Sequence, residues 1–226
     1  MSEFHRKSVD RTLDVVVADM AEKGWSHLST GIDPVDTAAI RGLFSTMSDR
    51  LTVDRSVKPE ISVIAPREKS KVLASSSQEM SFHTDNVYLE DPCKSIALFC
   101  SVQAEEGGVN QLVDGLAVAR ELPEDAREAL ADPRWSWTHP ATQEPSGEFS
   151  VLDEERERIR WWRMSLLNKE MASIAIADAF EDAINSAEEQ TVLMQPGDIL
   201  VTDNTRMLHN RSAFVGERRV YRTRFW

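Results

Sequence analysis

Cysteine and long apolar runs are scarce in this sequence, and both absences narrow the class of protein. The 226 residues include two cysteines, Cys93 and Cys100, which gives no disulfide framework and indicates a reducing compartment such as the cytoplasm. No window approaches the roughly 18 consecutive apolar residues of a membrane span. The first residues also lack the apolar core of a secretory signal. We therefore expect a cytoplasmic protein without a membrane partner.

Positive charge is also in short supply. The sequence has 26 lysines and arginines against 38 acidic residues, a net charge of −12. This balance argues against nucleic acid as a partner, because a phosphate backbone requires a concentrated basic surface. Repeats and low-complexity linkers are absent, so we expect a single domain over residues 1–226 with a sizeable core. The sequence leaves the oligomeric state unknown.

What the sequence does contain is a short motif in which an imidazole and a carboxylate stand two residues apart. His83 and Asp85 would point to the same face of an extended strand, with Thr84 turned away. They could hold one metal ion from one side, although most tripeptides of this kind have no ligand. A third ligand is needed from elsewhere in the chain, and His209 is the best candidate. His5 and His27 have no partners at ligand spacing and are interpreted as structural.

Two histidines and one carboxylate on one face are typical of non-haem Fe(II) oxygenases. Asp85 and His209 lie about 120 residues apart, with many short strands between them. If the three side chains bind one metal ion, the fold must therefore place the segment of His209 beside the segment of His83 and Asp85. The Pro196-Gly197 turn and the strand after it lead directly to His209, and Asp203 could support the site from just before it.

Short strands separated by turn residues make up most of the chain after residue 53, which predicts an α+β fold. We expect a double-stranded β-helix (jelly roll) core flanked by helices, with an N-terminal helical scaffold at about residues 1–52 packed on it. Apolar spacing and caps predict helices at 8–24, 33–51, 116–122, 124–130 and 168–189. Strands are predicted at 24–28, 61–64, 71–77, 96–102, 109–115, 135–139, 158–163, 191–203 and 217–226.

Two of these segments carry more specific predictions. The helix at 168–189 should bury a stripe formed by Met171, Ile174, Ala175, Ala179 and Ile184. The polar, turn-rich segment 140–147 should be mobile without substrate and form part of a lid.

Four arginines gather in the last ten residues of an otherwise acidic chain. Alternation along a strand places Arg218, Arg222 and Arg224 on one face, and Arg219 with Tyr221, Thr223 and Phe225 on the other. Arginine recognises carboxylates through two parallel hydrogen bonds, so either face could bind an acid. The alternative is a solvated edge strand whose charges prevent pairing with another chain.

Several motifs in register point to one family. They are His83-Thr84-Asp85, Gly107-Gly108, the turn Gln195-Pro196-Gly197-Asp198, Asp203-Asn204 leading to His209, and Arg218. Over roughly residues 70–226 the sequence resembles the Fe(II)- and 2-oxoglutarate-dependent dioxygenases of the TauD/TfdA, clavaminate synthase-like group. The resemblance implies that His83, Asp85 and His209 bind Fe(II). A carboxylate at position 85 differs from the halogenases of that superfamily, which have Gly or Ala there.

The resemblance also implies a cosubstrate site for 2-oxoglutarate, used together with O2. Arg218 would pair with the far carboxylate, with Arg219 as the neighbouring alternative. Asn110 stands where the family usually has a Thr or Ser that helps to hold the same group, and its amide can still donate a hydrogen bond.

The expected function is hydroxylation or desaturation of a small metabolite, with succinate and CO2 as co-products. Arg222 or Arg224 would suit a substrate carboxylate, which favours an amino acid or a similar acid. Two alternatives stay open. One is a non-catalytic jelly-roll binding protein, and the other is a zinc hydrolase with the same three ligands, which would give Arg218 no role.

Overall fold

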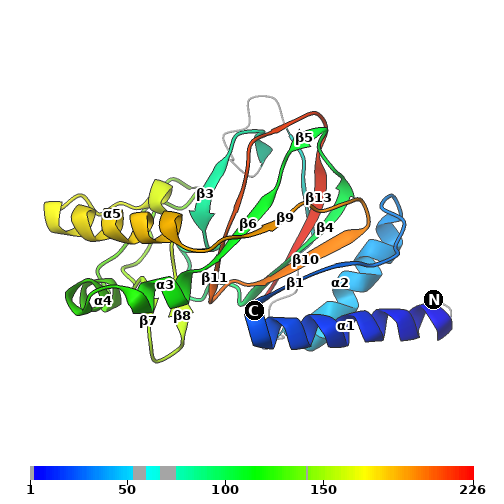
Figure 1. The fold of residues 1–226 in the computed structure, drawn as a ribbon, viewed down its shortest axis with the longest axis horizontal. Coiled ribbons are helices and arrows are strands. Elements are labelled where there is room, and N and C mark those ends of the chain that lie inside the picture. Colours follow the sequence, from blue (N-terminus) through cyan, green and yellow to red (C-terminus); the bar gives the residue numbers. More distant parts are fainter. Residues whose placement is uncertain (1–2, 53–59, 67–74, 141) are drawn as a thin grey trace.

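The computed structural model describes residues 3–52, 60–66, 75–140 and 142–226, with side chains from Leu13 onward. Two antiparallel sheets form its centre (Figure 1). The larger has the order β1 (Trp25–Ser29), β10 (Asp198–Asp203), β4 (Ser95–Val102), β13 (Arg219–Phe225) and β2 (Ser62–Ile64). The smaller has the order β3 (Met80–His83), β11 (Met207–Arg211), β6 (Asn110–Asp114) and β9 (Gln190–Val192). The α+β jelly-roll prediction is confirmed.

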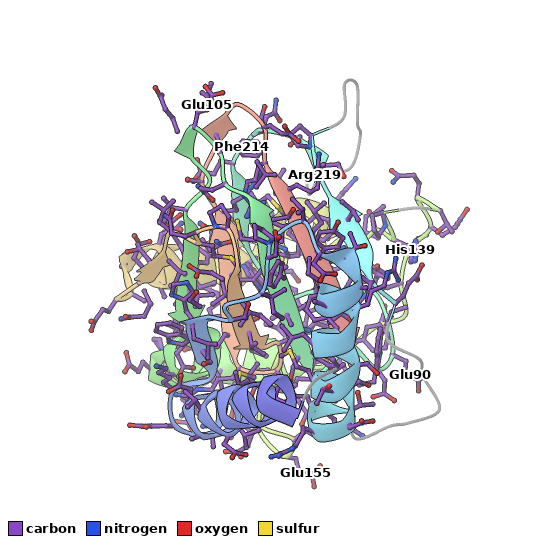
Figure 2. All side chains as sticks on the ribbon, turned by 90° about the vertical axis from the view of Figure 1, so that its right-hand side faces the viewer. Glu90, Glu105, His139, Glu155, Phe214 and Arg219 are labelled. Atoms are coloured by element: carbon purple, nitrogen blue, oxygen red, sulfur yellow. The ribbon has the colours of Figure 1, made fainter. Side chains whose placement is uncertain are left out.

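The helices α1 (Glu3–Lys23) and α2 (Thr37–Leu51) cover one face of the larger sheet (Figures 1 and 2). Strand β4 shows how the sequence makes this possible, because its side chains are apolar on both faces. Ala97 and Phe99 pack under the helices, whereas Leu98 and Cys100 join the core on the opposite face of the sheet. The strand predicted at 96–102 is therefore confirmed, and it is buried on both faces.

Besides its helices, the N-terminal region contains the strand predicted at 24–28, which is β1 and forms an edge of the larger sheet by pairing with β10. Helix α1 ends at Lys23, close to the predicted end at residue 24, because Gly24 takes a positive φ of 79°. Helix α2 begins later than predicted. Its N-cap is Asp36, whose carboxylate accepts from the amides of Ala38 and Ala39, while Asp33 only closes the turn before it.

A second helical layer covers the outside of the smaller sheet (Figure 1). It contains α3 (Gly115–Glu121), α4 (Glu124–Ala131) and α5 (Met171–Ser186), and its core includes the buried Trp135, Trp137 and Trp161. The predicted stripe of α5 is correct at Ile184 and wrong at Met171, which is 83% exposed. The buried residues are Ser173, Ala177, Phe180 and Ile184. Phe180 determines this face because its ring packs edge-on against Trp161 at 4.8 Å.

Short elements complete the fold. They are β5 (Glu106–Gly107), β12 (Phe214–Val215), β7 (Leu152–Asp153), β8 (Arg158–Ile159) and the 3-10 turn η2 (Arg163–Ser165). The strand predicted at 135–139 forms only isolated bridges, among them Trp135 to Phe149 and Thr138 to Pro145. These bridges join residues beside the segment 140–147 to each other and to Pro145 within it. The role of this segment as a lid stays a prediction. The strand predicted at 71–77 falls mostly on residues 71–74, outside the described part of the chain.

Candidate metal centre

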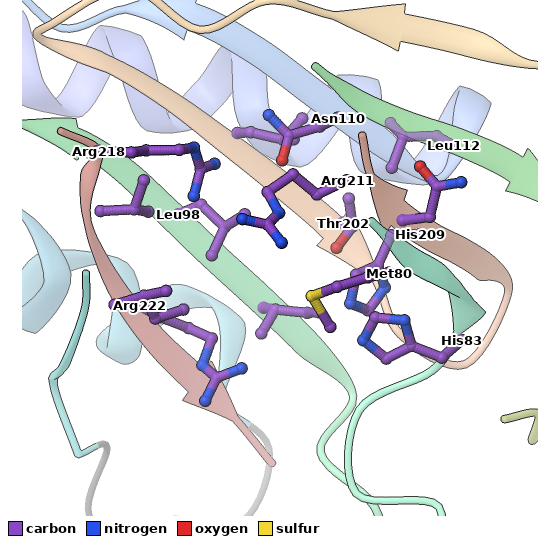
Figure 3. A pocket seen from close by; sticks show the side chains of 15 residues that line it. Met80, His83, Leu98, Asn110, Leu112, Thr202, His209, Arg211, Arg218 and Arg222 are labelled. Atoms are coloured by element: carbon purple, nitrogen blue, oxygen red, sulfur yellow. The ribbon is translucent and has the colours of Figure 1, made fainter. Parts of the chain in front are cut away.

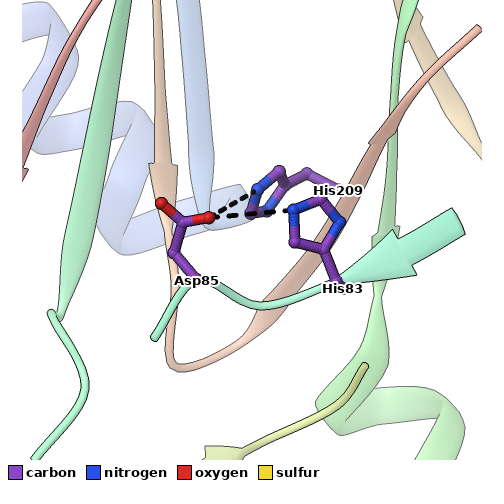
Figure 4. Close-up of side chains that lie close together, drawn as sticks. All are labelled: His83, Asp85 and His209. Atoms are coloured by element: carbon purple, nitrogen blue, oxygen red, sulfur yellow. Dashed lines mark ion pairs between the residues drawn. The ribbon is translucent and has the colours of Figure 1, made fainter. Parts of the chain in front are cut away.

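The structure brings His83, Asp85 and His209 together (Figure 4). Their candidate ligand atoms all lie within 4.8 Å of one another. The Nε2 atoms of the two histidines each stand 3.7 Å from Oδ1 of Asp85, and the two imidazole rings are 4.3 Å apart. Three donors around one shared point are what a single divalent ion needs.

Strand pairing explains why residues so distant in the sequence meet. His83 ends β3 and is paired directly with His209 on the antiparallel neighbour β11. The two histidines are therefore cross-strand neighbours on the same face of the smaller sheet. Asp85 lies two residues beyond the end of β3, and the main chain of the intervening Thr84 is held by Trp161. The prediction that Thr84 turns away agrees with this arrangement.

The protonation of the cluster suits a metal. Nδ1–H of His83 donates to the carbonyl of Ser81 (2.9 Å), which leaves Nε2 with its lone pair toward Asp85. Burial, assisted by His209, lowers the pKa of His83 to about 3, so this imidazole is neutral. Burial alone would raise the pKa of the Asp85 carboxyl, but Arg222 and Arg224 hold it well below its usual range. A neutral imidazole and a carboxylate are the ligand forms that metals require.

The second oxygen of Asp85 is bound by two arginines of β13. Nε of Arg224 donates to Oδ2 at 2.7 Å, and Nη1 of Arg222 contacts the same oxygen at 3.3 Å. Burial would lower the pKa of both guanidinium groups. At Arg224 the closer ion pair reverses this effect and raises the pKa, whereas at Arg222 burial prevails and the pKa is lowered. Sequence spacing had indicated substrate as the partner of these arginines and missed their contact with Asp85.

The backbone of Asp85 is held by Asn204, which is 2% exposed. The amide of Asp85 donates to Oδ1 of Asn204 (2.7 Å), and Nδ2 of Asn204 donates to the carbonyls of Asp85 (3.0 Å) and Cys93 (2.8 Å). The adjacent Asp203 accepts from Thr205 instead and shapes the turn before β11. Of the two, Asn204 is thus the residue that contacts the candidate metal ligand Asp85. The sequence analysis had noted Asn204 only as part of a motif.

A pocket extends from the histidines into the space between the sheets (Figure 3). Arg218, directly before β13, lines it together with Val220 and Arg222, so the face predicted to carry Arg218 and Arg222 does point inward. Arg219 lies elsewhere, paired with Glu217 and 42% exposed, near the end of the molecule that carries Glu105 and Phe214 (Figure 2). Asn110 also lines the pocket, and its Nδ2 donates to the carbonyl of Val192 at 3.3 Å.

Arg218 lies at the end of this pocket away from the histidines (Figure 3). It is 5% exposed, its Nε has no hydrogen-bond partner among the described residues, and no carboxylate there forms an ion pair with it. Gly108 leaves room for this side chain, because a Cβ on Gly108 would lie 3.3 Å from Arg218. Gly107 packs against the backbone of Ala213 instead, and both glycines have φ near 70°.

Arg211, a pocket residue that sequence reasoning missed, is placed differently. Its guanidinium donates to the carbonyls of Ser76 and Gln78 and lies over the ring of Phe214 at 4.6 Å. His27, expected to be structural, pairs with Asp198 at 3.0 Å. The side chain of His5 lies outside the described residues. None of the helices in the described part of the chain has the length and apolar character needed to cross a bilayer.

A jelly roll with two histidines and one carboxylate clustered beside its interior pocket defines a candidate non-haem metal protein. The model of the family described as taurine catabolism dioxygenase TauD, TfdA family matches residues 28–224, and the chain belongs to this family.

Comparisons with curated proteins give relatives of moderate similarity. Gamma-butyrobetaine dioxygenase of Homo sapiens is 28% identical over 163 residues, which cover 63% of this chain and 42% of that protein. Trimethyllysine dioxygenase of Neurospora crassa is 32% identical over 140 residues, or 50% of this chain and 28% of that protein. The chain thus spans less than half the length of these curated relatives.

Solved structures share the fold at low sequence identity. An asparagine oxygenase in complex with Fe(II), 2S,3S-3-hydroxyasparagine and succinate has a TM-score of 0.80 at 15% identity, covering 97% of this chain and 79% of that chain. The non-haem iron oxygenase OrfP in complex with Fe and alpha-ketoglutaric acid has a TM-score of 0.73 at 16% identity, with coverage of 97% and 79%. These likenesses support the jelly-roll architecture.

Proposed function

We propose that this protein is an Fe(II)- and 2-oxoglutarate-dependent oxygenase that acts on a small amino acid or a related carboxylate. The observation that carries the proposal is the cluster of two imidazole nitrogens and one carboxylate oxygen within 4.8 Å, placed beside a pocket that contains arginines. The donor set fits Fe(II), because His83 is neutral, Asp85 is ionised, and three protein ligands leave other positions open.

In this proposal His83, Asp85 and His209 hold the iron. When bound with 2-oxoglutarate and O2, the iron centre supplies oxidative decarboxylation of the keto acid to succinate and CO2, coupled to oxidation of a substrate C–H bond. The contribution of the protein is to hold the ligands, orient the two organic molecules and limit access of water. The burial of His83 and Asp85, each 6% exposed, serves the last of these purposes.

Arg218 is our candidate for the far carboxylate of 2-oxoglutarate, with Asn110 beside it. A buried cation without a counter-charge is costly, so an anion in the pocket would satisfy Arg218. Arg222 is already paired with Asp85, and a ligand there must compete with that carboxylate. The exposure of Arg219 speaks against it as the cosubstrate ligand.

For the substrate we propose a carboxylate that meets Arg222, which lines the pocket close to the metal ligands. Similar proteins support an amino-acid-like molecule: two are a gamma-butyrobetaine dioxygenase and a trimethyllysine dioxygenase, and two solved oxygenases hold 3-hydroxyasparagine and 3-hydroxy-arginine. We favour hydroxylation, with desaturation as the other possible outcome at the same carbon. We also propose a cytoplasmic location. The net charge of −12 supports a small molecule rather than nucleic acid as the binding partner.

The test is formation of succinate from 2-oxoglutarate by the purified protein with Fe(II) and O2. A panel of free amino acids and trimethylammonium carboxylates is added one compound at a time, and the product is identified by mass. We expect one group of related compounds to stimulate succinate formation and to gain an oxygen atom, or to lose two hydrogens. Binding of Fe(II) and 2-oxoglutarate without any turnover over the whole panel would instead favour a non-catalytic binding protein.

A further inference from the structure

The two oxygens of Asp85 have different surroundings, and this asymmetry is the starting point. Oδ1 faces the Nε2 atoms of both histidines at 3.7 Å, on the side where a metal would lie. Oδ2 faces away and accepts the hydrogen bond from Nε of Arg224 at 2.7 Å. One oxygen is therefore available to a metal and the other is already engaged.

We propose that Arg224 is a positioning residue that makes Asp85 bind the metal through one oxygen only. The inference rests on the proposed function, because it takes the three ligands to be a metal centre. A carboxylate whose oxygens are both free can chelate a divalent ion and fill two of its positions. A charge-assisted hydrogen bond to Oδ2 opposes that rotation and keeps Oδ1 alone directed at the site.

The number of open positions gives this restraint a function. An octahedral ion with two histidines and a one-oxygen carboxylate keeps about three positions for other ligands. If Asp85 took two positions, about two would remain, and a chelating keto acid would fill both of them. The restraint would thus preserve one position for a further ligand. This role differs from that of an arginine that binds the substrate or the cosubstrate.

Two further observations assign the role to Arg224 rather than to Arg222. The contact of Arg222 with Oδ2 is longer, at 3.3 Å, and Arg222 lines the pocket, where a ligand can draw it away. Arg224 is absent from the pocket lining within the described residues. In addition, Asn204 already fixes the main chain of Asp85 on both its amide and its carbonyl. The side-chain torsions are then the main freedom left to Asp85, and they are what Arg224 controls.

The experiment counts the exchangeable waters on Mn(II), a stand-in for Fe(II) that is stable in air, by water-proton relaxation of the metal-loaded protein. We expect about three waters for the wild type and for Arg224→Lys, which restores a cationic donor. Arg224→Met should keep about two. With saturating 2-oxoglutarate the count should fall to about one for the wild type and Arg224→Lys, and to about zero for Arg224→Met. Arg219→Met, on the same strand but paired with Glu217 at the surface, is the matched control and should equal the wild type.

Each result separates the two claims. If Mn(II) binds and Arg224→Met keeps the same number of waters as the wild type, the positioning role of Arg224 is wrong and the metal centre stands. If the wild type binds no Mn(II), the proposed function fails, and the inference fails with it. Should Arg224→Met not fold, Arg224→Leu, which is also apolar and has no donor for Oδ2, gives the same decision through its water count.

Discussion

At the scale of single residues, the candidate site depends on side chains that hold a candidate metal ligand in place from outside the cluster of His83, Asp85 and His209. Asn204 is the clearest case, because one buried amide group joins the turn before β11 to Asp85 and to Cys93. The position of the carboxylate relative to His209 is therefore set by a residue only five positions before that histidine. An outer contact of this kind affects both folding and metal affinity.

We predict that Asn204→Ala lowers the free energy of unfolding by about 3 kcal/mol, because it leaves buried main-chain groups at Asp85 and Cys93 without partners. Metal affinity should fall by roughly 10- to 100-fold. Urea unfolding of the metal-free protein and a Mn(II) titration measure the two effects. Asn185→Ala, exposed on α5, is the control and should change neither. Unaltered metal affinity in a folded Asn204→Ala variant would contradict the role given to Asn204.

The arginines of the last strand allow a second prediction at this scale. Arg218→Ala should raise the concentration of 2-oxoglutarate required for half-maximal activity by roughly ten- to a hundredfold, since a charge-assisted pair is worth about 1.5–3 kcal/mol. Arg219→Ala should leave this requirement unchanged. Arg222→Ala should mainly weaken binding of the substrate. If only the Arg222 variant requires more 2-oxoglutarate, the far carboxylate of 2-oxoglutarate lies nearer the metal site than proposed. The proposed role of Arg222 in binding the substrate would then be wrong.

Sequence reasoning reached the three candidate ligands because His83 and Asp85 share a local spacing and His209 follows a turn and a strand. Alternation along a strand is a local rule, and it correctly grouped Arg218 with Arg222; the choice of that face over the face with Arg219 came from the family resemblance. It missed the contacts of Arg222 and Arg224 with Asp85, which join residues about 140 positions apart. Nothing in the spacing of the arginines says which carboxylate they meet, because that depends on how the two sheets are placed against each other.

At the scale of elements, helix α5 shows where a local pattern is ambiguous. Its sequence is rich in alanine and isoleucine on several sides, so more than one stripe fits a helical period. Packing selects the face that carries Phe180, because that ring reaches Trp161, and the main chain of Trp161 is bonded to Thr84 beside the metal ligands. The helix thus supports the segment that carries Asp85.

This packing predicts a large difference between two positions on the same helix. Phe180→Ala removes a fully buried ring and should destabilise the protein by about 3–4 kcal/mol. Met171→Ala, at a side chain that is 83% exposed, should change the stability by less than about 0.5 kcal/mol. Urea unfolding of both variants gives the comparison. Equal losses would mean that the face of α5 assigned here is incorrect.

At the scale of the whole molecule, the fold joins an early motif to a late one. The smaller sheet sets β3 beside β11, and the larger sheet carries the arginines of β13 that reach Asp85. The candidate site is therefore built from both sheets, and neither sheet contains it alone. The α+β class and the jelly roll could be predicted from many short strands and turn residues, whereas the strand order within each sheet had to come from the structure.

The central claim is that His83, Asp85 and His209 together bind one Fe(II), and anaerobic Fe(II) binding measured by equilibrium dialysis tests it most directly. We predict about one equivalent of Fe(II) for the wild type with saturating 2-oxoglutarate. The variants His83→Ala, Asp85→Ala and His209→Ala should each lower the Fe(II) affinity by more than the roughly 10- to 100-fold that is typical when a residue contacting a metal ligand is replaced. Their circular dichroism spectra should stay near that of the wild type. Wild-type affinity in any one of the three variants would show that its residue is not a ligand, and a wild type that binds no Fe(II) would contradict the account as a whole.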